Sequence, residues 1–321
     1  MTIPVGVFVP QGWRLDLVAI QDPVEQYEAM TRVAQTAEAA GLDSIWLYDH
    51  FLTVPTIEHE TTFECWTATA GLARDTQRVR IGQMVTCNSY RHPALLAKMA
   101  STVDVMSHGR LNFGLGAGWY EAEYLAYGYR YPDIPERMRR FREAVELISR
   151  MWTEADPAYE GKYYRIEDAI NVPRGAQQPH IPMWIGGGGE RVTLRLVAKY
   201  GAAANIGGSP EVILHKLDVL KRHCDDVGRD YDEIIRSSSS LVHLLQPGEN
   251  PEDATVAWRG GQSLATYRQE FLVGTPDQVV AALQAKIDAG INYLIIYLQG
   301  SAYDPSLVEQ LAREVVPHLR G

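Results

Sequence analysis

The stretch VRIGQMVTCNSYRHPALLAKMASTVDVMSHGRLNFGLG, residues 79–116, contains a complete strand–helix–strand unit. Residues 79–87 and 111–116 are apolar enough for buried strands, and each is bounded by turn-forming residues. Between them, Pro93 suits the first position of a helix and His108-Gly109 suits its end. Apolar residues follow Pro93 at three- and four-residue spacing: Leu95, Met99, Val103 and Met106. A helix that joins two buried strands predicts parallel pairing and an α/β fold.

The same alternation extends along the chain in both directions. Strand-like runs lie at 3–9, 44–48, 79–87, 111–116, 181–186, 202–206, 233–245 and 292–298. Helix-like runs lie at 24–40, 62–73, 93–106, 138–152, 190–199, 211–226, 275–290 and 305–319. Eight strands that alternate with helices predict a (β/α)8 TIM barrel. A doubly wound open sheet is the second choice, because the first strand-to-helix turn lacks the G-x-G-x-x-G pattern.

Two segments suit neither a core strand nor a core helix. Residues 119–135 are rich in tyrosine, and residues 246–270 have no clear period. We interpret both as insertions into a single domain that spans residues 1–321. They are expected to shape the pocket for a substrate, although so many tyrosines could equally form a packed interface.

The composition narrows the class of partner. The net charge is −10 and 46% of the residues are hydrophobic, which disfavours nucleic acid or an anionic membrane as the main partner. Three cysteines without a C-x-x-C pair indicate neither a disulfide framework nor a zinc site. The first residues contain no basic, signal-like region. We therefore expect a cytoplasmic protein that acts on a small molecule, without a metal.

Polar residues cluster where the strands are expected to end. Active sites of parallel barrels lie at the carboxyl ends of the strands. Asp49 and His50 directly follow the strand-like run SIWLY, and Thr86 lies near the end of the third strand. A histidine at such a position can act as a general acid or base. The same Asp-His pair could also be only a polar strand exit.

Glycines mark two further strand ends. Gly114, Gly116 and Gly118 alternate after the fourth strand, where they could admit a flat ligand or simply pack inside a crowded barrel. Gly186, Gly187, Gly188 and Gly189 join the fifth strand to a helix, with Arg191 and Thr193 close behind. Backbone N–H groups at a helix start bind anions, so this loop predicts a phosphate site.

The ordered set WLYDH, RHPALLAK, GRLNFGLGAGW and IPMWIGGGG resembles the bacterial luciferase-like flavin and deazaflavin oxidoreductases over about residues 3–206. YDHF and GAGWYEAEYLAYGY look most like a branch described as probably dependent on coenzyme F420. The resemblance implies a TIM barrel, often dimeric, with a flavin-type ring over the strand ends. It also implies F420 as the cofactor and hydride transfer to or from a small organic substrate as the reaction.

The resemblance carries over to particular residues. It implies that the catalytic residues are His50, as proton donor or electrostatic partner, and Asp49, which would position His50 or the ring. A non-prolyl cis peptide is expected near Gln83-Met84, and Thr86 is expected to contact the ring. The remaining contacts that it implies are Gly116, Ala117, Gly118 and Trp119 beside the ring, and Gly186, Gly187, Gly188, Gly189, Arg191 and Thr193 at its phosphate. In some branches a glutamate directly follows the fourth-strand glycines, whereas this chain has Trp119 and Tyr120 before Glu121.

Three alternatives remain open from the residues. The first is an FMN-dependent monooxygenase that receives reduced flavin from a separate reductase. The second is a phosphate-binding barrel enzyme without a redox cofactor, which the glycine loop would allow. The third is a deazaflavin-binding protein without catalytic activity. A homodimer is expected from the resemblance alone.

Overall fold

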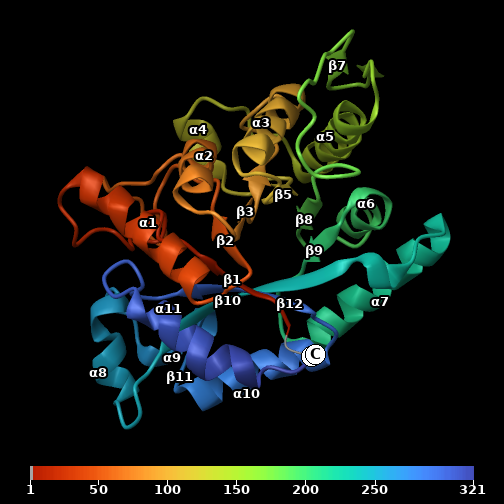
Figure 1. The fold of residues 1–321 in the computed structure, drawn as a ribbon. Coiled ribbons are helices and arrows are strands. Elements are labelled where there is room, and N and C mark those ends of the chain that lie inside the picture. Colours follow the sequence, from red (N-terminus) through yellow and green to blue (C-terminus); the bar gives the residue numbers. More distant parts are fainter. Residues whose placement is uncertain (1–2) are drawn as a thin grey trace.

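The structure is a computed structural model that describes residues 3–321, and it contains a closed ring of parallel strands surrounded by helices (Figure 1). The strands of the ring, in order, are β1 (Val5–Phe8), β2 (Ser44–Leu47), β3 (Arg80–Gln83), β5 (Leu111–Gly116), β8 (Met183–Gly186), β9 (Ala203–Asn205), β10 (Ile235–Leu244) and β12 (Tyr293–Leu298). β12 pairs with β1, and β10 pairs with both β9 and β12, which closes the ring. The predicted (β/α)8 barrel is confirmed, and the open sheet is wrong.

Helices cover the outside of the ring. They are α1 (Pro23–Ala39), α2 (Cys65–Asp75), α3 (Pro93–Met106), α5 (Ile134–Thr153), α6 (Thr193–Tyr200), α7 (Pro210–Val227), α10 (Pro276–Asp288) and α11 (Ser306–Gln310). A π-helical turn, Leu311–Val315, and a 3₁₀ turn, Val316–His318, follow α11. Several helices begin at residues that favour a helix start, such as the capping box of Thr275 and Gln278 at α10. The helix predicted from residue 190 begins only at Thr193.

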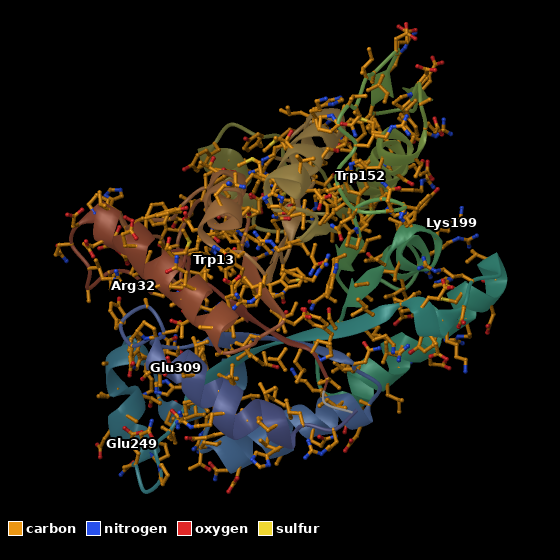
Figure 2. The ribbon with its side chains drawn as sticks, in the orientation of Figure 1. Trp13, Arg32, Trp152, Lys199, Glu249 and Glu309 are labelled. Carbon is orange, nitrogen blue, oxygen red and sulfur yellow. The ribbon has the colours of Figure 1, made fainter. Side chains whose placement is uncertain are left out.

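The core has two layers. Aliphatic side chains such as Val33, Ile45 and Leu147 fill the space between strands and helices. The inside of the barrel holds mainly aromatic residues, among them Trp46 and Trp184. Figure 2 shows the side chains on this framework; of those that it labels, Arg32, Lys199, Glu249 and Glu309 are charged and exposed.

The third predicted strand, 79–87, is broken in two. β3 ends at Gln83, a cis peptide bond joins Met84 to Val85, and the short strand β4 (Thr86–Cys87) then pairs with β5. The non-prolyl cis bond therefore lies one residue later than the expected Gln83-Met84 position.

Both predicted insertions contain short helices. Segment 119–135 holds α4 (Glu121–Ala126), and segment 246–270 holds α8 (Pro251–Thr255), a 3₁₀ turn (Val256–Trp258) and α9 (Leu264–Glu270). Sequence analysis missed β11 (Phe271–Gly274), which pairs with the second half of β10. It also missed the hairpin of β6 (Tyr159–Glu160) and β7 (Arg165–Ile166), which projects from the barrel near α5 (Figure 1). These runs of two to four residues are too short to show a period. Among the described residues, no helix is long and apolar enough to cross a membrane.

Candidate active site

Two adjoining cavities lie where the barrel strands end. The smaller, about 460 Å³, contains His50, and we call it the histidine cavity. The larger, about 880 Å³, contains Lys286, and we call it the lysine cavity. The residues that line both are Trp13, Tyr48, Met84 and Asn205. Both volumes fall in the range of small-molecule binding sites.

Most of the predicted site residues meet in the histidine cavity. Those that line it are Asp49, His50, Met84, Thr86, Gly116, Ala117, Gly118, Trp119, Gly186, Gly187, Gly189 and Thr193. They come from four separate places in the chain: the ends of β2, β5 and β8, and the break between β3 and β4. The barrel thus brings together residues that are far apart in sequence. The hydroxyl of Thr86 accepts a hydrogen bond from Trp66 of α2 at 3.2 Å and keeps its own proton to donate.

Three predicted residues do not line this cavity. Gln83 is buried and donates to the hydroxyl of Thr69 on α2, so it points into the layer between strand and helix. Neighbouring side chains of a strand point to opposite faces, which turns Met84 toward the cavity instead. Arg191 is exposed, and Gly188 lies against the side chain of Lys216.

His50 is held from two sides. Its ring stacks on Trp13, with centroids 4.0 Å apart and planes inclined by 5°. Its Nδ1 lies 2.8 Å from Oε2 of Glu123. Fixing Nδ1 in this way leaves Nε2 as the nitrogen that can exchange a proton with a ligand.

Glu123, which the sequence analysis did not select, is the partner of His50. Its carboxylate is fully buried and also accepts hydrogen bonds from the Tyr90 hydroxyl at 2.7 Å and from the Phe51 and Leu52 N–H groups at 2.7 and 3.0 Å. Burial acts to raise the pKa of Glu123. The hydrogen bond to His50 and the attraction between the two side chains outweigh burial, and the Leu52 N–H and the Tyr90 hydroxyl add to them. The pKa of Glu123 therefore lies below its ordinary value.

Asp49 lines the histidine cavity and is bound to the loop before α3. Its side chain accepts two hydrogen bonds from Arg91, at 2.7 and 3.0 Å, and one from the Cys87 N–H at 2.8 Å. Burial acts to lower the pKa of Arg91, but the charge and hydrogen bonds of Asp49 outweigh burial, so the pKa lies above its ordinary value. The described contacts of the Asp49 carboxylate are therefore with Arg91 and Cys87 and not with His50, and its expected contact with the cofactor ring stays a prediction. Asp49 ties the exit of β2 to β4 and to the start of α3.

Glycines at the ends of β5 and β8 make room for the side chain of Val85, which lies at the break in the third predicted strand. A Cβ on Gly116 would lie 2.6 Å from a methyl carbon of Val85, and one on Gly186 would lie 2.8 Å from the other. Gly118 has φ +78°, and its Cβ would meet the Tyr124 hydroxyl. A side chain at Gly116 or Gly186 would collide with Val85. It would also fill part of the cavity that these glycines line.

The glycine loop joins β8 to α6, as expected. A lysine from α7 lies beside it, which the sequence did not predict. Gly187 has φ +112°, and the N-terminus of α6 that follows has no side-chain cap. Lys216 of α7 lies beside the loop, but its Nζ is 2.5 Å from Glu190 and is therefore paired. The loop still offers backbone N–H groups and the dipole of α6 to an anion.

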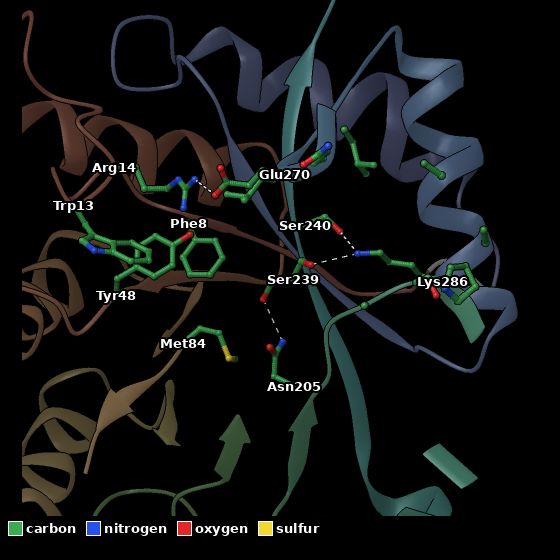
Figure 3. Close-up of a pocket in the computed structure, with 18 residues that line it drawn as sticks. Phe8, Trp13, Arg14, Tyr48, Met84, Asn205, Ser239, Ser240, Glu270 and Lys286 are labelled. Atoms are coloured by element: carbon green, nitrogen blue, oxygen red, sulfur yellow. Dashed lines mark hydrogen bonds and ion pairs between the residues drawn. The ribbon is translucent and has the colours of Figure 1, made fainter. Parts of the chain in front are cut away.

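The lysine cavity extends from the strand ends toward α7 and α10 (Figure 3). Arg14 forms an ion pair with Glu270 at one side of it. Asn205 donates to Ser239 at 3.2 Å, and Lys286 reaches in from α10. Lys286 was not predicted as a site residue, because the sequence of a helix does not show which of its lysines faces a cavity.

The model of the luciferase-like monooxygenase family matches residues 3–267 of the chain. The chain belongs to this family. The resemblance expected from the sequence is thereby confirmed. Luciferase-like relatives include an F420-dependent glucose-6-phosphate dehydrogenase of Amycolatopsis mediterranei, 28% identical over 326 residues that cover 91% of this chain and 94% of the relative.

Solved structures of luciferase-like enzymes share the fold. An F420-dependent secondary alcohol dehydrogenase in complex with an F420–acetone adduct superposes with a TM-score of 0.82 at 18% identity, covering all of both chains. A monooxygenase from Streptomyces bottropensis superposes with a TM-score of 0.81 at 21% identity, covering 98% of this chain and 99% of its own. These structures agree with the barrel assignment.

Proposed function

We propose that this protein is an F420-dependent oxidoreductase that transfers a hydride between the deazaflavin and a small organic substrate. The observation that carries the proposal is His50, held by Glu123 and stacked on Trp13 at the wall of the histidine cavity. The F420 dependence of the Amycolatopsis relative, whose sequence aligns with nearly the whole chain, supports the cofactor.

The residues of the histidine cavity fit a flat ring with a phosphate-bearing tail. One wall is backbone at Gly116, Ala117 and Gly118, which lets a planar group come close. The buried indole N–H of Trp13 has no hydrogen-bond partner among the described residues and can donate to a ring oxygen. Gly187 and Gly189 lead toward the start of α6, where a phosphate would be stabilised.

The chain's own residues then do three things. When bound, F420 supplies a carbon centre that gives or takes a hydride without activating oxygen. Nε2 of His50 gives or takes the proton at the substrate atom where charge develops. Glu123 holds the His50 ring, and Asp49 holds the backbone that carries it. Trp13, Tyr48 and Met84 line both cavities and would flank the place where the ring and the substrate meet.

The first test is a titration of the purified protein with oxidised F420 and with FMN, following the fluorescence of each cofactor. Tight F420 binding with weak FMN binding is expected. The converse would sink the proposal, as would a protein that binds neither cofactor.

An FMN-dependent monooxygenase is the second candidate. It is favoured by the family description and by the similarity to the Streptomyces monooxygenase. Such an enzyme would consume oxygen when supplied with reduced FMN by a separate reductase. The proposed F420 enzyme consumes none, so an oxygen electrode separates the two.

A homodimer and a cytoplasmic location complete the proposal. Both come from the family resemblance and the composition. Sedimentation equilibrium at micromolar concentration tests the dimer directly, and a mass of one chain would refute it.

A further inference from the structure

The lysine cavity contains a positive charge that no lining residue in the described part of the chain (residues 3–321) neutralises. Its charged lining residues are Arg14, Glu270 and Lys286. Arg14 and Glu270 form an ion pair with each other. Two cations and one anion leave one positive charge, which belongs to Lys286.

The partners of Lys286 among the described residues are neutral oxygens. Its Nζ lies 2.7 Å from the Ser240 hydroxyl and 3.3 Å from the Ser239 carbonyl. Burial lowers the pKa of Lys286, and no nearby carboxylate offsets that effect. A partly buried ammonium in this setting gains from an anion that enters the cavity.

The surroundings of Lys286 leave space and donors for such an anion. Ala282 and Ala285 lie on the same face of α10 and line the same cavity, so their short side chains leave room beside the ammonium. Ser240 accepts from Lys286, so it keeps its hydroxyl proton for an acceptor oxygen beside the ammonium. The hydroxyl of Ser239 points to the other face of β10, where it accepts from Asn205. Figure 3 shows Lys286 directed from α10 toward these two serines.

We infer that the lysine cavity binds the anionic end, a carboxylate or a phosphate, of the organic substrate, and that Lys286 with the Ser240 hydroxyl recognises it. This inference rests on the proposed function, because it takes the adjoining histidine cavity to hold the cofactor ring. The substrate then extends from the border residues Tyr48 and Met84, where it reacts, toward Lys286, where its charge is neutralised. At about 880 Å³ the cavity has room for a substrate larger than a two- or three-carbon alcohol.

The test is calorimetric titration with succinate, inorganic phosphate and neutral succinamide, on the protein alone and on the protein saturated with F420. Lys286→Met is compared with the wild type, with Lys286→Arg, and with Lys221→Met as the matched change of an exposed lysine on α7. We expect Lys286→Met to weaken succinate or phosphate by about ten-fold or more, the loss typical of one charge-assisted hydrogen bond. Lys286→Arg and Lys221→Met should stay within about three-fold of the wild type.

Each alternative result has a definite meaning. A stronger effect on succinate or on phosphate identifies which anion the cavity prefers. Equal anion binding by Lys286→Met and the wild type overturns the inference. An F420 affinity that falls in parallel with anion affinity also overturns it, because the site would then hold the cofactor's own anionic tail. A wild type that binds no F420 but shows Lys286-dependent anion binding refutes the proposed function and leaves the anion site standing.

Folding of the variants is checked by thermal unfolding. Because Lys286→Met removes a partly buried, unpaired charge, its melting temperature should equal or exceed that of the wild type. Succinamide should bind equally to all four proteins, since it has the shape of succinate without the charge.

Discussion

At the scale of single residues, His50 and Asp49 are neighbours in sequence with separate tasks. Asp49 is bound to Arg91 and Cys87, and His50 is bound to Glu123, which is 73 residues away. A carboxylate that fixes one nitrogen of an imidazole sets the other nitrogen for proton transfer. The arrangement gives two residue-scale predictions.

Replacing His50 should abolish most turnover and spare cofactor binding. His50→Ala is expected to lower kcat by about 10²- to 10⁴-fold, the contribution of a positioned acid–base group, with the F420 dissociation constant within about three-fold of the wild type. Steady-state kinetics and fluorescence titration measure the two effects. His59→Ala, at an exposed position, is the matched control. Full activity of His50→Ala would remove His50 from the mechanism.

Glu123→Gln should lower stability in a pH-dependent way. The pKa of Glu123 is below its ordinary value in the folded state, so its charge stabilises the fold above pH about 4.3 and that contribution is lost as pH falls through the folded pKa. At pH 7 the loss should be about 1–3 kcal/mol, shrinking as the solution is acidified below the ordinary glutamate pKa. Urea unfolding at pH 7 and pH 4 measures it, and exposed Glu121→Gln is the control. A difference that grows on acidification would contradict the assignment.

At the scale of elements, the break between β3 and β4 limits the size of the side chains that the ends of β5 and β8 can carry. Val85 turns into the space beside β5 and β8, where Gly116 and Gly186 leave room for its methyl groups. Side chains at these glycines would need that same space. The glycine-rich ends of the fourth and fifth predicted strands are therefore partly a packing requirement.

Gly116→Ala should destabilise the fold, and a second change should partly restore it. The new Cβ would lie 2.6 Å from a Val85 methyl carbon, so overpacking of about 1–3 kcal/mol is expected. Adding Val85→Ala removes that methyl group, so the double variant should lose less stability than the sum of the two single changes. Gly207→Ala, with nothing within 4 Å of its Cβ, is the control in urea unfolding. Strict additivity would show that the contact does not limit the site.

At the scale of the whole molecule, the two cavities are built from distant parts of the chain. Arg14, in the loop after β1, pairs with Glu270 at the end of α9, 256 residues further on. The second insertion thus contributes to the wall of the lysine cavity next to the first strand. The residues that line the two cavities come from the ends of several strands of the ring. A ligand that spans both cavities would therefore contact distant parts of the barrel.

Cofactor binding should therefore stabilise the whole barrel. A ligand that binds only the folded state at about 100 times its dissociation constant raises the free energy of unfolding by about 2.7 kcal/mol. We expect F420 to raise the urea midpoint accordingly and FMN to have a smaller effect at equal concentration. Stabilisation by FMN and not by F420 would favour the monooxygenase alternative. Removing F420 by dialysis should return the midpoint to its starting value.

Strand and helix periodicity over residues 79–116, repeated along the chain, was sufficient to predict the barrel and the edge at which Asp49, His50 and the glycines lie. This succeeded because alternation and helix caps are local properties, and because parallel strands must present their carboxyl ends together. Short elements such as β11 lie below the length at which a period can be recognised.

The tertiary structure alone decided which partners the side chains have. Glu123 rather than Asp49 holds His50, and Gln83 faces α2 rather than the cavity. Among residues 3–321, the partners of Lys286 are neutral oxygens. These pairings join positions that are far apart in sequence, and those of His50 and Lys286 depend on where α4 and α10 lie against the ring. Periodicity records which face of an element is buried, whereas hydrogen bonding and charge compensation depend on distances that exist only after the chain has closed.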